Sequence, residues 1–180
     1  MIEIKVCPAG ENVLLVLTGL GGSLSGYGEK YIKIAKRANT EYGFTTCVAA
    51  MTVEVWEDRE SAFDEIFLRS CSAAPKVYII GVSAGASLAL WYAYKYKNIA
   101  KILCINPVLN INLPLTSKGI KAFQGEKLYI VSGDGDPSSV WVKMMRGMPG
   151  AEVHILENVD HFFTEKLNEF IELPFKLLFN

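Results

Sequence analysis

Short apolar runs alternate along the chain with longer segments in which apolar residues recur at helical spacing. Residues 13–17 and 77–80 are continuously apolar, which is typical of interior strands covered on both faces. Residues 2–6 instead alternate apolar with polar side chains, as a half-buried strand at a sheet edge does. About seven strands are predicted, at residues 2–6, 13–17, 45–50, 77–80, 102–105, 128–131 and 153–156.

The segments between these runs predict helices. Apolar residues lie on one face of residues 59–71, for example, at intervals of three and four. Residues 51–58 and 106–125 lack this spacing and are predicted to be irregular. Helices are predicted at residues 26–42, 59–71, 138–147 and 162–178, and directly after Gly85, with Pro174 ending or kinking the last.

Strands that alternate with helices indicate an α/β domain, in which a mostly parallel sheet carries helices on both faces. We find no repeat, linker or low-complexity tract, so residues 1–180 are interpreted as a single domain. Ligands of such sheets bind beyond the carboxyl ends of the strands. The loops after Leu17, Ile80 and Val131 are therefore where chemistry is expected.

The composition narrows the class of partner. Hydrophobic residues make up 51% of the chain, the net charge is −1, and no basic stripe is visible, which argues against a nucleic-acid partner. No apolar run approaches the roughly 20 residues that span a bilayer. The first ten residues lack the apolar core of a signal peptide. These features predict a cytoplasmic protein without a membrane span.

Cysteines and histidines give no sign of a metal site. Cys7, Cys47, Cys71 and Cys104 form no C-x-x-C pair, and we expect them to be reduced thiols that pack as small apolar residues. Only two histidines are present, which argues against histidine-based metal binding. We expect neither a metal nor an organic cofactor.

Residues 81–85 read Gly-Val-Ser-Ala-Gly and match the pattern G-x-S-x-G, with Ser83 at the apex between a strand and a helix. Glycines at both ends let the strand and the helix approach closely, and the strained turn exposes the hydroxyl. A glycine-rich turn that merely closes a βα unit is the alternative interpretation. The five residues alone do not separate the two.

A serine nucleophile needs a base, and only two histidines are candidates. His154 falls inside a predicted strand, where a surface or half-buried histidine is ordinary. His161 follows that strand, at the edge where ligands bind. The alternative for His161 is a residue in the first turn of a helix capped by Asp160. The position of His161 at this edge, and the presence of only two histidines in the chain, favour His161 as the base.

The acid that orients the base is expected after the preceding strand, where Asp134 and Asp136 both qualify. Asp136 precedes Pro137 and could simply cap a helix, although a capping residue can also orient a histidine. Backbone N–H groups of Ala84, after the nucleophile, and of Leu20, in the glycine-rich loop, are the expected oxyanion donors. That loop lacks the spacing of a dinucleotide or phosphate loop.

With these residues in place, the chain resembles the α/β-hydrolase family from about residue 13 to residue 170. The order Ser83, Asp136, His161 matches that family's order of nucleophile, acid and base. In the family the acid commonly lies three residues after a glycine. Asp136 lies three residues after Gly133, whereas Asp134 follows Gly133 directly, so this spacing favours Asp136. The loop that begins at Thr18 looks like the family's oxyanion loop, with threonine in place of the usual histidine.

The resemblance implies an α/β-hydrolase fold trimmed at its N-terminal side, because the family core usually has about eight strands. Only about twenty residues, 106–125, stand where the family carries its lid. This resembles small, lid-poor esterases and thioesterases. The implied activity is a serine hydrolase that cleaves small-molecule carboxylic esters or thioesters through an acyl-enzyme on Ser83.

Two other functions remain open on the sequence: a non-catalytic binding protein on the same scaffold, and an acyltransferase with the same triad. The sequence does not specify the acyl group or the oligomeric state. Candidate substrate-binding residues are Gly19, Gly21, Trp56, Val108 and Leu109. For the large apolar side chains among them, packing in the core is the commoner role.

Overall fold

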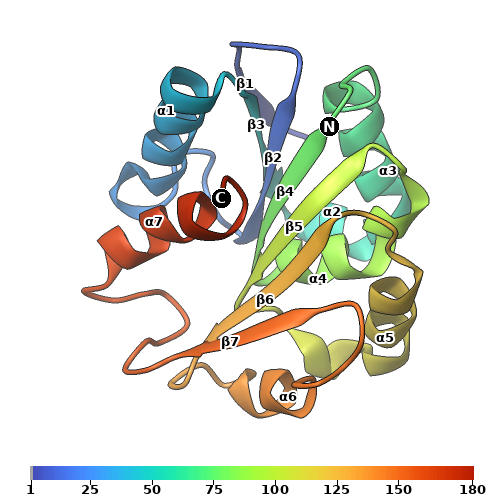
Figure 1. The fold of residues 1–180 in the computed structure, drawn as a ribbon, viewed down its shortest axis with the longest axis vertical. Helices are drawn as coiled ribbons and strands as arrows, with labels where there is room; N and C mark the ends of the chain where they lie inside the picture. The colour runs from blue at the N-terminus through green and yellow to red at the C-terminus, as the bar shows by residue number, and fades with distance from the viewer. Residues whose placement is uncertain (1) are drawn as a thin grey trace.

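A computed structural model describes residues 2–180, which form one seven-stranded sheet between two layers of helices (Figure 1). The strand order is β1-β3-β2-β4-β5-β6-β7, and every pairing is parallel except that of β1 with β3. The strands are β1 (Ile4–Cys7), β2 (Val13–Leu20), β3 (Thr45–Met51), β4 (Val77–Val82), β5 (Ile99–Ile105), β6 (Lys127–Gly133) and β7 (Glu152–Leu156). The predicted α/β class, strand number and edge position of the first strand are confirmed.

Helices divide unequally between the two faces of the sheet (Figure 1). Two of them, α1 (Lys30–Tyr42) and α7 (Leu167–Leu177), pack on one face. The other face carries α2 (Val53–Glu57), α3 (Arg59–Ser70), α4 (Ala84–Tyr92), α5 (Leu113–Ala122) and α6 (Ser139–Met144).

Strand β2 shows why its residues are apolar without alternation. Leu14 and Val16 belong to the core beneath α1 and α7, whereas Leu15 and Leu17 belong to the core beneath α4. All four are fully buried. Full burial of one such side chain contributes about 1.5–3 kcal/mol relative to exposure. The two cores therefore hold the central strands, and with them the strand ends, in fixed positions.

Two helices begin later than their apolar spacing predicts. Residues 27–29 form a 3₁₀ turn, and α1 begins only at Lys30 because Gly28 and Glu29 have positive φ angles of 58° and 59°. Residues 162–166 are likewise non-helical, because Phe163 and Glu165 have φ angles of 58° and 61°. Left-handed backbone cannot continue a right-handed helix.

Helical turns also occupy both stretches that we expected to be irregular. Thr52 caps α2 by accepting a hydrogen bond from Val55 N, and Asn112 caps α5 by accepting one from Leu115 N. Such caps offset unpaired N–H groups at a helix start. Pro174 does not end α7, which continues to Leu177. Across residues 2–180, no helix combines the length and apolarity needed to cross a membrane.

Candidate active site

Ser83 lies at the strained turn between β4 and α4, with φ 53° and ψ −115°. The turn is tight enough to require both flanking glycines. A Cβ added to Gly81 would lie 2.5 Å from Ala86 Cα, and one added to Gly85 would lie 2.4 Å from the carbonyl oxygen of Leu17. Such backbone strain costs about 1–3 kcal/mol and persists only where the surroundings enforce it.

Hydrogen bonds on both sides of the turn enforce that conformation. The N–H of Ser83 donates to the carbonyl of Ile105 on β5 (2.9 Å), and the carbonyl of Ser83 accepts from the N–H of Ser87 (3.1 Å). The buried hydroxyl of Ser87 in turn accepts a hydrogen bond from Val108 N (3.0 Å). The nucleophile candidate is thus tied to the loop after β5 as well as to its own helix.

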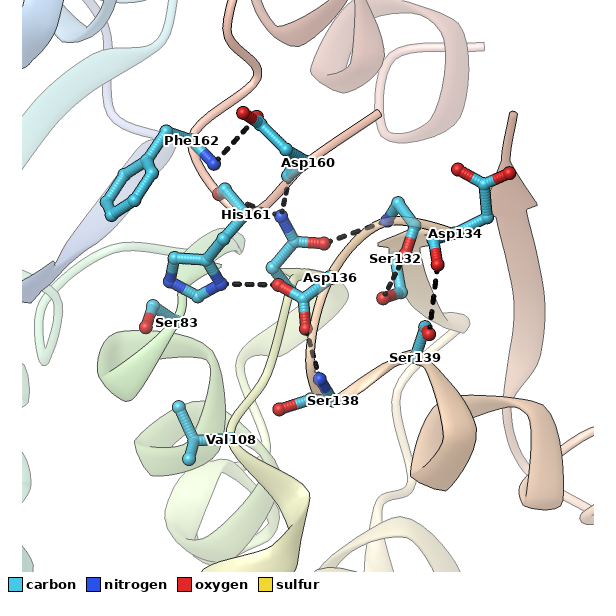
Figure 2. A network of polar contacts seen from close by, with 12 residues as sticks. Ser83, Val108, Ser132, Asp134, Asp136, Ser138, Ser139, Asp160, His161 and Phe162 are labelled. Atoms are coloured by element: carbon cyan, nitrogen blue, oxygen red, sulfur yellow. Dashed lines mark hydrogen bonds and ion pairs between the residues drawn. The ribbon is translucent and has the colours of Figure 1, made fainter. Parts of the chain in front are cut away.

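His161 and Asp136 meet although they are 25 residues apart in sequence (Figure 2). The Nδ1 atom of His161 is hydrogen-bonded to Oδ2 of Asp136, whose side chain is completely buried. Oδ1 of Asp136 accepts a hydrogen bond from Ser138 N (2.6 Å). The Asp136 carboxyl therefore both closes its own turn and fixes the ring of His161, the dual role that its place before Pro137 allowed.

Asp134, the other candidate acid, points away from this pair (Figure 2). Its side chain is exposed, and its Oδ1 accepts a hydrogen bond from Val159 N (3.3 Å). That bond ties the loop after β6 to the loop that carries the histidine. Asp134 thus has a structural contact, while the contact to the ring belongs to Asp136.

His154, the other candidate base, lies on β7 and does not reach the site. Its Nε2 lies 3.0 Å from Oε1 of Glu152, but the two atoms do not form a hydrogen bond. This contact is at most an ion pair in the protonated state of His154. The position on β7 matches the ordinary strand histidine that the sequence suggested.

Ser83 and His161 line one open cavity of about 340 Å³. Figure 2 shows the imidazole between Ser83 and the carboxyl of Asp136. Among residues 2–180, no hydrogen bond joins the Ser83 hydroxyl to the ring. Such bonds are often long in free enzymes and tighten when substrate binds. Ser83, His161 and Asp136 therefore lie in the order that proton transfer from a hydroxyl to an imidazole requires.

The start of α4 and the end of β2 flank the Ser83 hydroxyl. Ala84 is the first residue of α4, so its N–H has no partner within the helix. A Cβ added to Gly19 would lie 3.4 Å from Ser83 Cβ, so the chain leading to Leu20 passes directly beside Ser83. Both expected oxyanion donors thus belong to segments that border the serine.

Thr18 stabilises this loop in the position where the resemblance led us to expect histidine. It is fully buried, and its hydroxyl oxygen accepts a hydrogen bond from Met51 N (3.0 Å) on β3. The same hydroxyl lies within donating distance of the Gly19 carbonyl (3.1 Å). The Thr18 hydroxyl therefore links the loop to β3, although it lacks the imidazole ring of the expected histidine.

The proposed substrate-binding residues fall into two groups. Within the described residues, the lining of the Ser83 cavity includes Gly19 but not Gly21, Trp56, Val108 or Leu109. Leu109 is completely buried in the core, and Trp56 packs against Trp91 with ring centroids 5.5 Å apart. These large side chains have the core role that is more common for their type. Val108 is half-buried beside Ser87, and Gly21 lies outside the cavity.

Asn106 is a residue of this site that the sequence analysis missed. It is fully buried, with a φ of 48°. Its Nδ2 donates to the carbonyls of His161 (2.9 Å) and Asp160 (3.3 Å), and its Oδ1 accepts from Gly133 N (2.9 Å). One amide thus joins the ends of β5 and β6 to the loop that carries His161. Its place directly after a buried strand, at the ligand-binding edge, was the available signal.

Asp160 shapes the same loop from the exposed side. Its Oδ1 accepts hydrogen bonds from the N–H groups of Phe162 (3.1 Å) and Thr164 (2.8 Å). Hydrogen bonds from Thr164 lower the pKa of the Asp160 carboxyl. Asp160 therefore orders the turn after His161, although it caps no helix.

No protein-family model and no curated protein matches this sequence. Solved structures do match. Est1E from Butyrivibrio proteoclasticus superposes with a TM-score of 0.76 at 12% identity, over 99% of this chain and 93% of that one. An alpha-beta serine hydrolase homologue from Coxiella burnetii gives 0.69 at 18% identity, over 98% and 91%.

A third similar structure comes from work on LipS and LipT, which are described as two metagenome-derived lipolytic enzymes. It gives a TM-score of 0.73 at 16% identity, over 98% of this chain and 96% of that one. Identities this low establish the fold rather than the chemistry. The sheet order, the serine turn and these superpositions agree, and the chain has the α/β-hydrolase fold.

Proposed function

We propose that the chain is a serine hydrolase that cleaves carboxylic esters or thioesters of small molecules. The proposal depends on one observation: His161 is hydrogen-bonded to the buried carboxyl of Asp136 and lines the same cavity as Ser83. Similar structures are described as lipolytic enzymes, a serine hydrolase homologue and an alpha/beta hydrolase enzyme, which agrees with the proposal at the level of class.

In the proposed first step, Ser83 Oγ attacks the carbonyl carbon of the substrate while His161 Nε2 takes the hydroxyl proton. Asp136 holds Nδ1 and so leaves Nε2 free for that proton. The N–H groups of Ala84 and Leu20 stabilise the oxyanion, and each donor is worth about 3 kcal/mol in the transition state. The tetrahedral intermediate then expels the alcohol or thiol, which receives the proton from His161.

In the second step, water attacks the acyl-enzyme. His161 takes a proton from the water and returns it to Ser83 Oγ, and the carboxylic acid leaves. Every proton in this cycle is accounted for by Ser83, His161, water and the substrate. The cycle uses no group beyond those of the chain, the substrate and water.

The test combines turnover with covalent labelling. Wild-type protein should hydrolyse p-nitrophenyl esters of short acids and the matching thioesters, and a fluorophosphonate probe should label Ser83, as read by intact mass and peptide mapping. Ser83→Ala should lower the rate more than about 1,000-fold. Ser61→Ala, on the exposed side of α3, is the matched control and should leave the rate unchanged.

The outcomes separate the three functions. Equal activity in Ser83→Ala would refute the mechanism. A folded protein that neither turns over esters nor reacts with the probe would instead favour a binding protein. Transfer of the acyl group to an added alcohol, in preference to water, would identify an acyltransferase with the same acyl-enzyme.

A further inference from the structure

The cavity at Ser83 is surrounded by apolar side chains that are unusually exposed. Tyr27, Phe162 and Leu20 all line it and are 79%, 76% and 49% exposed. They come from separate segments: the 3₁₀ turn before α1, the loop after β7 and the end of β2. Exposed apolar groups that converge on one cavity, together with a few polar groups, mark a ligand site.

Lys30, the first residue of α1, carries the only formal charge of fixed sign in the cavity lining of residues 2–180. Arginine, aspartate and glutamate are absent from that lining. Within the described chain, no carboxylate lies at ion-pair distance from Lys30 Nζ. Lys76 and Lys95 have such partners at 2.9 Å and Lys166 has one at 2.8 Å, whereas most other lysines of residues 2–180, like Lys30, have none.

Aromatic rings, rather than acids, surround the Lys30 ammonium. Its Nζ lies 4.0 Å from the ring centroid of Phe170 and 5.3 Å from that of Tyr31. Gly26 packs against the stem, because a Cβ added there would lie 2.8 Å from Lys30 Cγ. The side chain is therefore held in place by packing. Burial lowers the pKa of Lys30, as expected for an ammonium whose hydration is incomplete.

A partly dehydrated cation without a counter-charge is unfavourable, and a negatively charged ligand offsets that cost. We propose that the cavity selects esters or thioesters that carry a carboxylate, which pairs with Lys30 while Tyr27, Phe162 and Leu20 contact the apolar part of the substrate. The proposal rests on the proposed function and adds the substrate class. Lys30 is the residue that sets specificity for charge.

The rival interpretation is purely structural. The contact of Lys30 with Phe170 joins α1 to α7, and a cation–π contact of this kind stabilises the fold. In that case, loss of the charge would lower the melting temperature and leave substrate preference unchanged. The test must therefore read preference and stability separately.

The kinetic test uses two pairs of esters that differ only in charge. The first pair is 4-nitrophenyl hydrogen glutarate and its methyl ester, which carry the charge on the acyl side. The second is 4-carboxyphenyl butyrate and its methyl ester, which carry it on the alcohol side. The wild type should prefer the charged member of at least one pair by about 10-fold in kcat/KM.

Three lysine variants then test whether Lys30 causes that preference. Lys30→Met should bring the ratio between charged and neutral ester close to one, and Lys30→Arg should retain it. Lys33→Met, on the exposed side of the same helix, is the control and should keep the wild-type ratio. A wild-type ratio at or below one in both pairs overturns the inference, as does a Lys30→Met ratio equal to that of the wild type.

A binding experiment keeps the inference separate from the proposed function. In Ser83→Ala protein, 4-phenylbutyrate should bind more tightly than 4-phenylbutyramide by calorimetry, and Lys30→Met in the same background should abolish the difference. If neutral esters are cleaved but neither preference appears, the inference fails and the hydrolase proposal stands. If carboxylate binding depends on Lys30 but no ester is cleaved, the inference stands and the hydrolase proposal fails.

Discussion

Asn106 provides the sharpest test of how this site is held together. Its side-chain amide donates to the carbonyls of His161 and Asp160 and accepts from Gly133 N. Because Asn106 is completely buried, removal of this amide leaves one N–H and two carbonyl groups without their partner. We therefore expect Asn106→Ala to loosen the loop that carries His161 while the sheet remains intact.

The size of the effect follows from these contacts. A buried polar group left without its partner costs about 1–3 kcal/mol, so loss of the amide should cost about 3 kcal/mol after partial replacement by water. Alanine at a φ of 48° adds roughly 1–2 kcal/mol, which glycine avoids. Asn106→Gly should thus be less destabilised than Asn106→Ala by about 1 kcal/mol. If His161 is the base, as proposed, its displacement by about 1 Å can cost about 100-fold in rate.

Asn98 is the matched control, because it lies at the opposite end of β5. Its Nδ2 also donates to two backbone carbonyls, those of Cys71 (3.1 Å) and Ala74 (2.9 Å). Urea unfolding would measure the stability of both variants, and p-nitrophenyl ester hydrolysis would give kcat, KM and the pH profile. Asn106→Ala should lose kcat at an unchanged KM, whereas Asn98→Ala should lose stability alone.

The positioning argument is refuted if the two variants, compared at equal folded fraction, have the same kcat and the same pH profile. It is also refuted if Asn106→Gly restores the full wild-type rate, because glycine corrects the backbone strain without replacing any hydrogen bond.

Three further predictions test other parts of the structure. Asp136→Asn should lower kcat by about 10,000-fold, whereas Asp134→Asn, which alters only a loop contact, should cost less than about 10-fold in the same ester assay. Gly119→Ala should lower the free energy of unfolding in urea by about 3 kcal/mol, because the new Cβ would lie 1.8 Å from a carbonyl oxygen of α4. Gly43→Ala should lower it by only about 1 kcal/mol, because its Cβ would meet open space and only the φ of 68° is unfavourable. Burial, and then a hydrogen bond to an aspartate, raises the pKa of Tyr96 to about 12. The folded state thus favours the neutral phenol, and this contribution is complete below pH 10 and is lost as the pH rises from about 10 to about 12. Between pH 9 and pH 11, the urea midpoint should fall less for Tyr96→Phe than for the wild type. An equal fall would contradict the raised pKa of Tyr96.

The alternation of strands and helices and the turn at Ser83 could be predicted from the order of residues alone. Both depend on residues that are neighbours along the chain. Continuous apolar runs specify strands that are buried on two faces, and glycines at positions 81 and 85 specify the close approach of β4 and α4. Helix starts were less predictable, because Glu29, Phe163 and Glu165 adopt left-handed backbone that their residue types do not favour.

Which side chains contact one another became clear only from the folded arrangement of the chain. The choice of Asp136 over Asp134 as the partner of His161 depends on the exact course of two loops that begin on different strands. The role of Asn106 depends on three strand ends at once, and the cavity that joins Lys30 to Ser83 depends on how α1 lies over the sheet. Hydrogen bonds and charge contacts act over a few ångströms in space, so residues that are far apart in sequence acquire them only when packing of the two cores sets the positions of the strands.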